Sequence, residues 1–398
     1  MSQYRNKYSP YIQYRGNLQN TYNKLTQKKK LNVVFLGGSV THGHSASDLE
    51  KWSWRALTGA FLQKRFPDAQ INLYDTARGE SGTFLGTYRL ERDILSHKPD
   101  LFIIEYAIND SYHLGMLDDE FEDEAARRYE TIIREVRSSF PECDIFGLII
   151  TDKILINTYP EDNMFPAARG HARIAKEYGI SMLNAGLALH KTVDLISNWY
   201  TYFYDNAHPI DAGHMGYFEC IEEYLYNELI CPEAVAAYGK EIIPHSLRDI
   251  VSDSLFDGNR TNTSVAALRG GDTHTTTRLV DTTFEYSSEP FDEPNQYYGY
   301  YFAKSPEQYI TFEFSGTEIA LWTLSYSRKG DENILVSIDG GDFFEMPLSN
   351  YNPTLIDENL ESGIHTVTVK PTFSSGNYDD FKIGSVFTRD SSLETKKQ

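Results

Sequence analysis

Cysteine is scarce in this sequence, and long apolar runs are missing from it. The 398 residues include only Cys143, Cys220 and Cys231, which are too few and too scattered for a disulfide framework or a cysteine-based zinc site. No apolar run approaches the ~20 residues that a membrane-spanning helix needs. The polar start, MSQYRNKYSPYIQYRGN, lacks the apolar core of a secretory signal. We therefore expect a cytoplasmic protein that does not bind a membrane.

Basic residues are also in the minority. Lysine and arginine together number 37 against 57 aspartates and glutamates, which gives a formal net charge of −20. A surface this acidic repels phosphate backbones and anionic lipids, so nucleic acid is a poor candidate partner and a neutral substrate fits better. Aromatic residues make up 14% of the chain. Tyrosine-rich surfaces often bind sugars or proteins, but most aromatic side chains belong to cores.

The first half of the chain alternates short apolar runs with longer amphipathic stretches. This alternation predicts strands that are joined by helical crossovers, and hence a parallel sheet buried on both faces. The predicted strands are residues 32–38, 71–75, 101–106, 144–151 and 180–184, and the predicted helices are residues 52–66, 118–140 and 165–178.

After about residue 229 the pattern changes to short strands separated by turn signals. The predicted strands include residues 309–316, 318–326, 334–341 and 365–371. Their spacing is typical of a β-sandwich. We therefore expect an α/β domain over residues 1–230, a linker over 231–254 that contains Pro232 and Pro244, and a β-sandwich over 255–390.

Gly37-Gly38-Ser39 directly follows the first predicted strand. Ligands bind outside the carboxyl ends of the strands in an open parallel sheet, so a serine at this turn faces the expected active-site edge. A serine here could equally cap the next helix. The sequence has no G-x-x-x-x-G-K-[ST] and no G-x-G-x-x-G motif, so a nucleotide-binding loop has little support.

Asp205 precedes His208 by three residues in the motif DNAHP. This spacing lets both side chains converge, so that the acid orients the imidazole while the imidazole takes a proton from a serine hydroxyl. The alternative is an aspartate that caps a loop beside a surface histidine. Four other histidines compete for the role of base, namely His42, His44, His171 and His214.

Two further motifs follow predicted strands. Asn109, in the sequence YAIND, could donate a side-chain hydrogen bond to a developing oxyanion, although asparagine is also an ordinary turn residue. The sequence ARGESG, residues 77–82, contains glycines that allow a close approach of backbone N–H groups.

The order of these motifs resembles that of the SGNH (GDSL-like) hydrolases, over about residues 31–229. The motifs that carry the resemblance are GGSVTHG, ARGESG, AIND and DNAHP. It implies a three-layer α/β/α fold and a carboxylic ester hydrolase in which Ser39 is the nucleophile, His208 the base and Asp205 its partner. It further implies an oxyanion site made by the Ser39 amide, a backbone amide of the second motif and Asn109.

The sequence departs from the family pattern at two positions. Gly38 replaces the aspartate that is common there, as it does in related carbohydrate esterases. Glu80 stands where the family has glycine, so either Glu80 or Gly79 would supply the backbone amide.

The substrate is the least constrained part of the prediction. The tyrosine-rich β-sandwich is similar to carbohydrate-binding modules. The two domains together resemble two-domain esterases that deacetylate plant polysaccharide fragments. We therefore expect an acetylated oligosaccharide as substrate and no cofactor. By that analogy Tyr298, Tyr301 or Trp322 would stack on a sugar, with Tyr326 and Tyr351 as further candidates, although the strand pattern favours a core position for Trp322. Modules of this type can bind Ca²⁺, for which Asp339, Asp342, Asp379 and Asp380 are candidates, although solvated acids explain them as well.

Two alternatives stay open. One is an esterase or thioesterase for small metabolites or lipids, with a sandwich that serves only dimerisation. The other is a catalytically inactive glycan-binding protein. A homo-oligomer is compatible with all of these.

Overall fold

The computed structural model describes most of the chain. It covers residues 4–28, 30–114, 118–238, 241–247, 249, 251, 259–264, 277–292, 297–324, 333–349, 353–372 and 381–390. The chain divides into two compact units, Met1–Phe256 and Asp257–Gln398.

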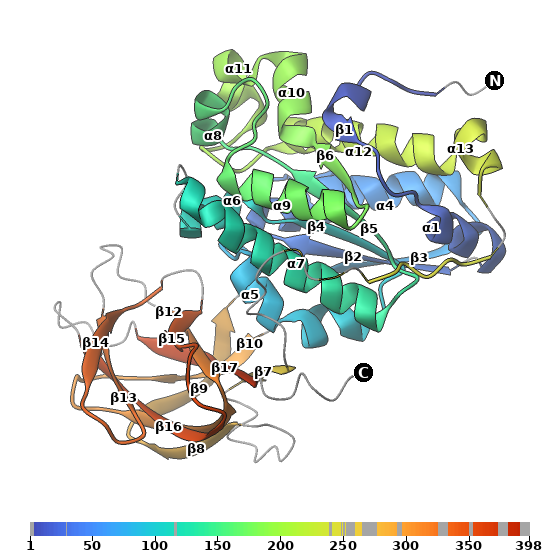
Figure 1. Cartoon of the computed structure of the whole chain (residues 1–398). Coiled ribbons are helices and arrows are strands. Elements are labelled where there is room, and N and C mark those ends of the chain that lie inside the picture. Colours follow the sequence, from blue (N-terminus) through green and yellow to red (C-terminus); the bar gives the residue numbers. More distant parts are fainter. Residues whose placement is uncertain are drawn as a thin grey trace. The chain divides into compact units, whose positions relative to one another are not determined.

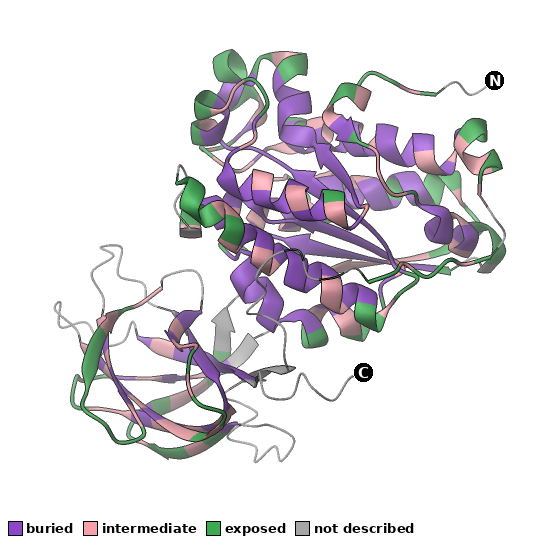
Figure 2. Ribbon diagram, in the orientation of Figure 1, coloured by how far each residue is buried: buried purple, intermediate pink, exposed green. Residues whose placement is uncertain are grey.

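A six-stranded sheet organises the first unit (Figure 1), with the strand order β1-β6-β5-β4-β2-β3. The strands are β1 (Ile12–Gln13), β2 (Lys30–Gly37), β3 (Gln70–Asp75), β4 (Leu101–Glu105), β5 (Asp144–Ile149) and β6 (Ser181–Asn184). Strands β2 to β6 pair in parallel, as predicted, and β1 is an antiparallel edge strand of two residues. Every residue of β4, β5 and β6 is buried, as Figure 2 shows. This burial explains why these strands are continuous apolar runs in the sequence.

Helices cover both faces of this sheet (Figure 1). Helix α7 (Glu122–Ser139) packs with α9 (Pro166–Glu177) and α5 (Thr83–Tyr88), while α4 (Trp54–Arg65) packs with α12 (Asp211–Leu229). The shorter helices are α1 (Gln19–Asn23), α2 (Ser39–His42), α3 (Leu49–Trp52), α6 (Ala107–Leu114), α8 (Lys153–Thr158), α10 (Ala185–Val193), α11 (Leu195–Tyr202) and α13 (Pro232–Ala236). The architecture is therefore the predicted α/β type.

The predicted helix over 52–66 is broken at Ser53. This residue has extended backbone angles, and its hydroxyl oxygen accepts a hydrogen bond from the backbone N–H of Ala56. The same hydroxyl donates to the carbonyl of Leu49. Ser53 therefore ends α3 and caps α4, which is a common role for serine.

The segment predicted to be a linker, residues 231–254, packs on the first unit where it is described. The backbone N–H of Ile243 donates to Asn20 Oδ1 at 2.9 Å, that of His245 to the carbonyl of Pro141 at 2.7 Å, and that of Val251 to Glu130 Oε1 at 2.8 Å. The boundary between the units accordingly lies at Phe256, beyond this segment.

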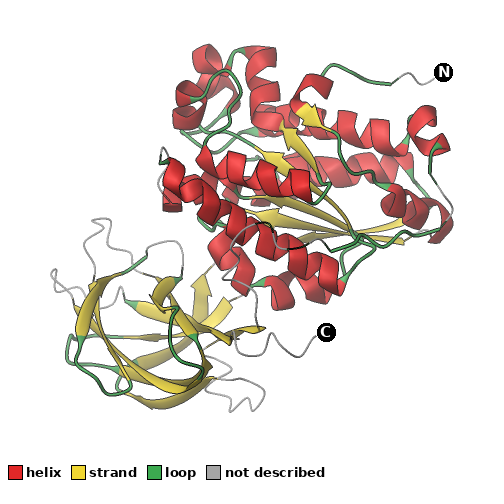
Figure 3. Ribbon diagram, in the orientation of Figure 1, coloured by secondary structure: helices red, strands yellow, loops and turns green. Residues whose placement is uncertain are grey.

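The described part of the second unit contains strands and no helix (Figure 3). One sheet has the order β15-β12-β17-β10-β9, with β7 also paired to β17, and the other has the order β14-β13-β16-β11-β8. The strands are β7 (Asn259–Ser264), β8 (Thr277–Thr282), β9 (Glu285–Asp292), β10 (Tyr297–Phe302), β11 (Ile310–Gly316), β12 (Glu318–Leu324), β13 (Asn333–Ile338), β14 (Phe344–Pro347), β15 (Thr354–Asp357), β16 (Gly363–Thr372) and β17 (Lys382–Asp390). All pairings are antiparallel. Alternate residues of β11 enter the core, so the predicted β-sandwich is confirmed.

Candidate active site

The turn after β2 has no space for side chains at its two glycines. A Cβ at Gly37 would lie 2.1 Å from Thr41 Oγ1, and a Cβ at Gly38 would lie 2.3 Å from Asn109 Oδ1. Glycine at both positions therefore lets α2 begin at Ser39 and lets Asn109 approach the turn. This packing gives a physical reason for glycine at position 38, where the resembling family commonly has an acid.

Ser39, His208 and Asp205 form one hydrogen-bonded line. Ser39 Oγ lies 2.8 Å from His208 Nε2, and His208 Nδ1 lies 2.7 Å from Asp205 Oδ2. Because a carboxylate only accepts hydrogen bonds, the proton between His208 and Asp205 belongs to Nδ1. Nε2 is then free to accept the proton of the Ser39 hydroxyl, which is the arrangement of an activated serine nucleophile.

The loop that carries Asp205 and His208 is fixed by local hydrogen bonds. Asp205 Oδ1 accepts from the backbone N–H groups of Ala207 at 2.8 Å and His208 at 2.7 Å, while Oδ2 remains for the imidazole. Trp199, in α11, donates its indole N–H to the carbonyl of Asp205 at 2.6 Å. The three-residue spacing in DNAHP is therefore the spacing that lets one carboxylate hold both its own turn and the ring.

The charge of Asp205 is maintained by these contacts. Partial burial alone would raise the pKa of this carboxyl, but the hydrogen bonds from the His208 ring and from the backbone N–H groups of Ala207 and His208 outweigh it and lower the pKa. Asp205 is thus an anion near neutral pH and can stabilise a positive charge on His208.

The loop that carries Gly79 and Glu80, two of the predicted oxyanion residues, approaches Ser39 at Gly79. A Cβ at Gly79 would lie 3.9 Å from the Cβ of Ser39, which places the ARGESG loop next to the nucleophile. Glu80 has a φ of 60°, a conformation that favours glycine, and this agrees with the glycine that the resemblance implies there. The backbone N–H of Arg78 donates to the carbonyl of Gly37 at 2.8 Å, which ties this loop to the turn after β2.

Asn109 lies in α6 with its side-chain amide against Gly38. Within the described residues this amide makes no hydrogen bond. The neighbouring Asp110 fixes the position of the helix, because it accepts from the backbone N–H and the hydroxyl of Thr83, both at 2.8 Å, and is bonded to His171 Nε2 at 2.9 Å. Asn109 is therefore held in place by its neighbour and keeps its own donor available. No pattern in the sequence indicated this role of Asp110.

The other candidate histidines are occupied elsewhere. His42 Nδ1 pairs with Asp75 Oδ2 at 2.7 Å, and His171 pairs with Asp110. His214 is fully buried, which lowers its pKa to about 4. His44 is the exception, because its ring lies against that of His208 at a centroid distance of 4.3 Å. Among the five histidines only His208 is placed to take the proton of Ser39.

The expectation of exposed aromatic rings on the sandwich needs correction for two residues. Tyr301 is 5% exposed and belongs to the hydrophobic core of the second unit. Trp322 is 2% exposed and its ring stacks on that of Phe387. Both lie in strands that bury them, so neither offers a ring face to solvent. The side chain of Tyr298, as well as Tyr326 and Tyr351, lies outside the described residues.

Metal ligands do not cluster within the described residues. Asp339, one of the candidate calcium ligands, is bonded to His365 Nδ1 and to the backbone N–H of Thr366, both at 2.7 Å. Asp379 and Asp380 lie outside the described residues. In the described part of the chain, none of the helices has the length and apolar character required to span a bilayer.

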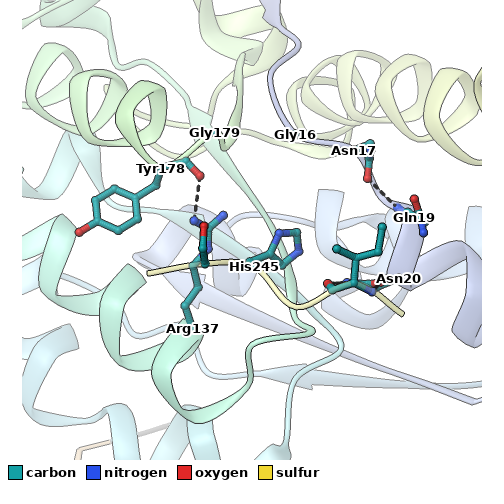
Figure 4. A pocket seen from close by; sticks show the side chains of 10 residues that line it. Gly16, Asn17, Gln19, Asn20, Arg137, Tyr178, Gly179 and His245 are labelled. Atoms are coloured by element: carbon teal, nitrogen blue, oxygen red, sulfur yellow. Dashed lines mark hydrogen bonds between the residues drawn. The ribbon is translucent and has the colours of Figure 1, made fainter. Parts of the chain in front are cut away.

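A cavity of about 280 Å³ lies apart from these residues; Figure 4 shows the side chains that line it. Arg137, Tyr178 and His245 line it, and His245 Nε2 is bonded to Asp144 at the first position of β5. The cavity thus lies near the amino end of β5, whereas Ser39 follows the carboxyl end of β2.

Residues 35–215 match the sequence model of the GDSL-like Lipase/Acylhydrolase family. No curated protein sequence matches the chain. Among solved structures, the chain is similar to a two-domain esterase (CEX) active on acetylated mannans, with a TM-score of 0.75 at 20% identity, over 96% of this chain and 98% of that one. A crystal structure of that esterase with mannopentaose aligns with a TM-score of 0.71 at 20% identity, over 97% and 99% of the two chains. The predicted resemblance to GDSL-like (SGNH) hydrolases is confirmed over residues 35–215, and the chain as a whole has the fold of this two-domain protein.

Proposed function

We propose that this protein is a serine esterase that removes O-acetyl groups from oligosaccharides of plant mannans or xylans. The observation that carries the esterase part is the hydrogen-bonded line from Ser39 through His208 to Asp205 at the carboxyl edge of a parallel sheet. The acetylated-sugar part is supported by the two-domain esterase of similar fold, whose described activity is on acetylated mannans.

The proposed reaction starts with the attack of Ser39 Oγ on the acetyl carbonyl carbon, while His208 Nε2 accepts the hydroxyl proton. The carbonyl oxygen becomes an oxyanion, which receives hydrogen bonds from the Ser39 amide, the amide of Gly79 or Glu80, and Asn109 Nδ2. As the intermediate collapses, the ester C–O bond breaks and His208 returns the proton to the sugar oxygen. The sugar leaves with a free hydroxyl, and acetyl-Ser39 remains.

The second half of the reaction uses the same residues. Water attacks the acetyl carbonyl of Ser39 while His208 takes one of its protons, and the same donors bind the second oxyanion. Cleavage of the bond to Ser39 Oγ releases acetic acid, which ionises to acetate in water, and His208 returns the proton it took to Oγ. Asp205 stays an anion throughout, because its role is to orient the imidazole and to stabilise its charged form.

The β-sandwich is proposed to bind carbohydrate and to help to hold the oligosaccharide. In the alternative proposal the protein is an esterase or thioesterase for small metabolites or lipids, and the sandwich serves only dimerisation. A series of acyl-chain lengths separates the two proposals, because a sugar deacetylase prefers acetyl steeply, whereas a lipid esterase becomes more active as the acyl chain grows.

The test of the proposal is mass spectrometry of acetylated mannan and xylan oligosaccharides after incubation with the protein and with the Ser39→Ala variant. We expect loss of acetyl groups with the protein and not with the variant. Intact acetylated oligosaccharides in both samples would refute the sugar substrate. Equal hydrolysis of 4-nitrophenyl acetate by both proteins would refute Ser39 as nucleophile.

A further inference from the structure

The backbone of His44 is held firmly next to the nucleophile. Its N–H donates to the carbonyl of Ser39 at 3.0 Å, and its own carbonyl lies 3.4 Å from the buried His214 Nε2. Three residues on, Ser47 donates from its backbone N–H and its hydroxyl to the two carboxylate oxygens of Asp211, at 2.8 and 2.7 Å. The segment between α2 and α3 is thus fastened to the start of α12.

This segment contains two left-handed residues. Gly43, with φ of 106°, ends α2, and Ser45 has a φ of 68°. For serine this conformation is unfavourable, so the surrounding contacts must stabilise it. These two left-handed residues stand on either side of His44, whose backbone they help to fix.

The imidazole of His44 is exposed and lies against the imidazole of His208, with ring centroids 4.3 Å apart and planes inclined by 54°. Within the described residues the ring nitrogens of His44 make no hydrogen bond. Partial burial and the charge of His208 lower the pKa of His44, so its ring is neutral near neutral pH and one nitrogen can accept a hydrogen bond.

The position of the leaving group follows from the proposed reaction. His208 Nε2 returns a proton to the leaving oxygen, so this oxygen must come within hydrogen-bond distance of Nε2. In a sugar acetate the adjacent ring carbon usually carries a hydroxyl, which lies about one hydrogen-bond length from the leaving oxygen. Because the two imidazole rings are in contact, such a hydroxyl is within reach of His44.

We propose that His44 binds the free hydroxyl adjacent to the ester oxygen, so that the site selects acetate esters of vicinal diols. The inference rests on the proposed esterase function and adds a specificity-determining residue to it. His44 is a substrate-binding residue in this account, and the proton transfers remain with His208.

The test compares two substrates in the full-length protein and in the His44→Phe variant, which keeps an aromatic ring beside His208 but has no nitrogen. One substrate is a sugar monoacetate with a free adjacent hydroxyl, and the other is the matching deoxy sugar acetate. Loss of one hydrogen bond to a neutral group corresponds to about a tenfold change at most. We expect the ratio of the two kcat/KM values to favour the hydroxyl-bearing sugar about tenfold in the protein and to fall to about 1 in the variant. The matched control is His97→Phe. The ring of His97 also stacks on an aromatic ring, that of Tyr74, but His97 precedes the amino end of β4. The ratio of the two kcat/KM values should keep its native value in this control.

Two results would overturn the inference. An unchanged ratio in His44→Phe would show that His44 does not contact the adjacent hydroxyl. An equal loss on both sugars would show that His44 acts only through His208. Failure of the proposed function would look different. Either the native protein would hydrolyse neither of the two sugar acetates, or the Ser39→Ala variant would be as active as the native protein.

Discussion

Replacing Asp205 by asparagine tests whether the carboxylate orients the catalytic imidazole. Asparagine keeps the size of the side chain, and its Oδ1 can still accept from the backbone N–H groups of Ala207 and His208. Its Nδ2, however, is a donor placed opposite His208 Nδ1. Two donors cannot share a hydrogen bond, so the ring proton moves to Nε2, which then cannot accept the proton of Ser39.

The expected loss in kcat is about 10⁴-fold, the loss seen when the carboxylate of a serine protease triad becomes an amide. This corresponds to about 5 kcal/mol of transition-state stabilisation. The assay is steady-state hydrolysis of 4-nitrophenyl acetate, with a thermal unfolding curve to verify that the variant is folded.

Asp162→Asn is a matched control for this variant. Asp162 accepts a hydrogen bond from the backbone N–H of Met164, two residues on, as Asp205 does from Ala207, and no contact links it to His208 within the described residues. We expect the control to keep native kcat. An Asp205→Asn variant with kcat within about tenfold of the native value would refute the proposed role of Asp205.

Two further predictions concern groups near Ser39. Asn109→Ala should lower kcat by about 10²- to 10³-fold with little change in KM, because the donor acts on charge that develops in the transition state. Steady-state kinetics on 4-nitrophenyl acetate measure both constants. A variant that raises KM and keeps the native kcat would contradict this role. Glu105, at the end of β4, accepts from Thr41 Oγ1 at 3.0 Å, and burial raises its pKa to about 8. Between pH 4.5 and about 8 the Glu105 carboxyl stays protonated in the folded protein but is ionised in the unfolded chain. The contribution of Glu105 to stability therefore falls as the pH rises through this range. Urea unfolding measures the free energy of unfolding at each pH. Between pH 4.5 and about 8 this free energy should fall less in Glu105→Gln than in the native protein. An identical pH dependence in the two proteins would contradict the raised pKa of Glu105.

The sequence predicted most of the elements of the sheet because buried parallel strands are nearly continuous apolar runs. Strand β4 illustrates this, since all of Leu101–Glu105 is buried. The break at Ser53 was not predicted, because serine caps a helix only where the backbone turns, and the apolar periodicity runs through it. The two-residue strand β1 carries too few residues for any periodicity to register.

The candidate site was less predictable than the fold. The DxxH spacing indicated that Asp205 and His208 could converge, but His42 also has an aspartate partner, Asp75, which lies 33 residues away in the chain. Only the folded structure, in which Ser39 Oγ lies 2.8 Å from His208 Nε2, shows which imidazole faces Ser39. The strand pattern favoured the core position that Trp322 occupies. The burial of Tyr301 was harder to predict, because a tyrosine-rich run gives no contrast between apolar and polar positions along the strand.

Labelling with a fluorophosphonate, which reacts with activated serine nucleophiles, tests the central claim most directly. Peptide mass spectrometry should locate the adduct on Ser39, and the labelling rate should fall steeply in His208→Ala because the hydroxyl then has no base. An adduct on a different side chain, or labelling at the native rate without His208, would contradict the assignment of Ser39, His208 and Asp205 as the catalytic group.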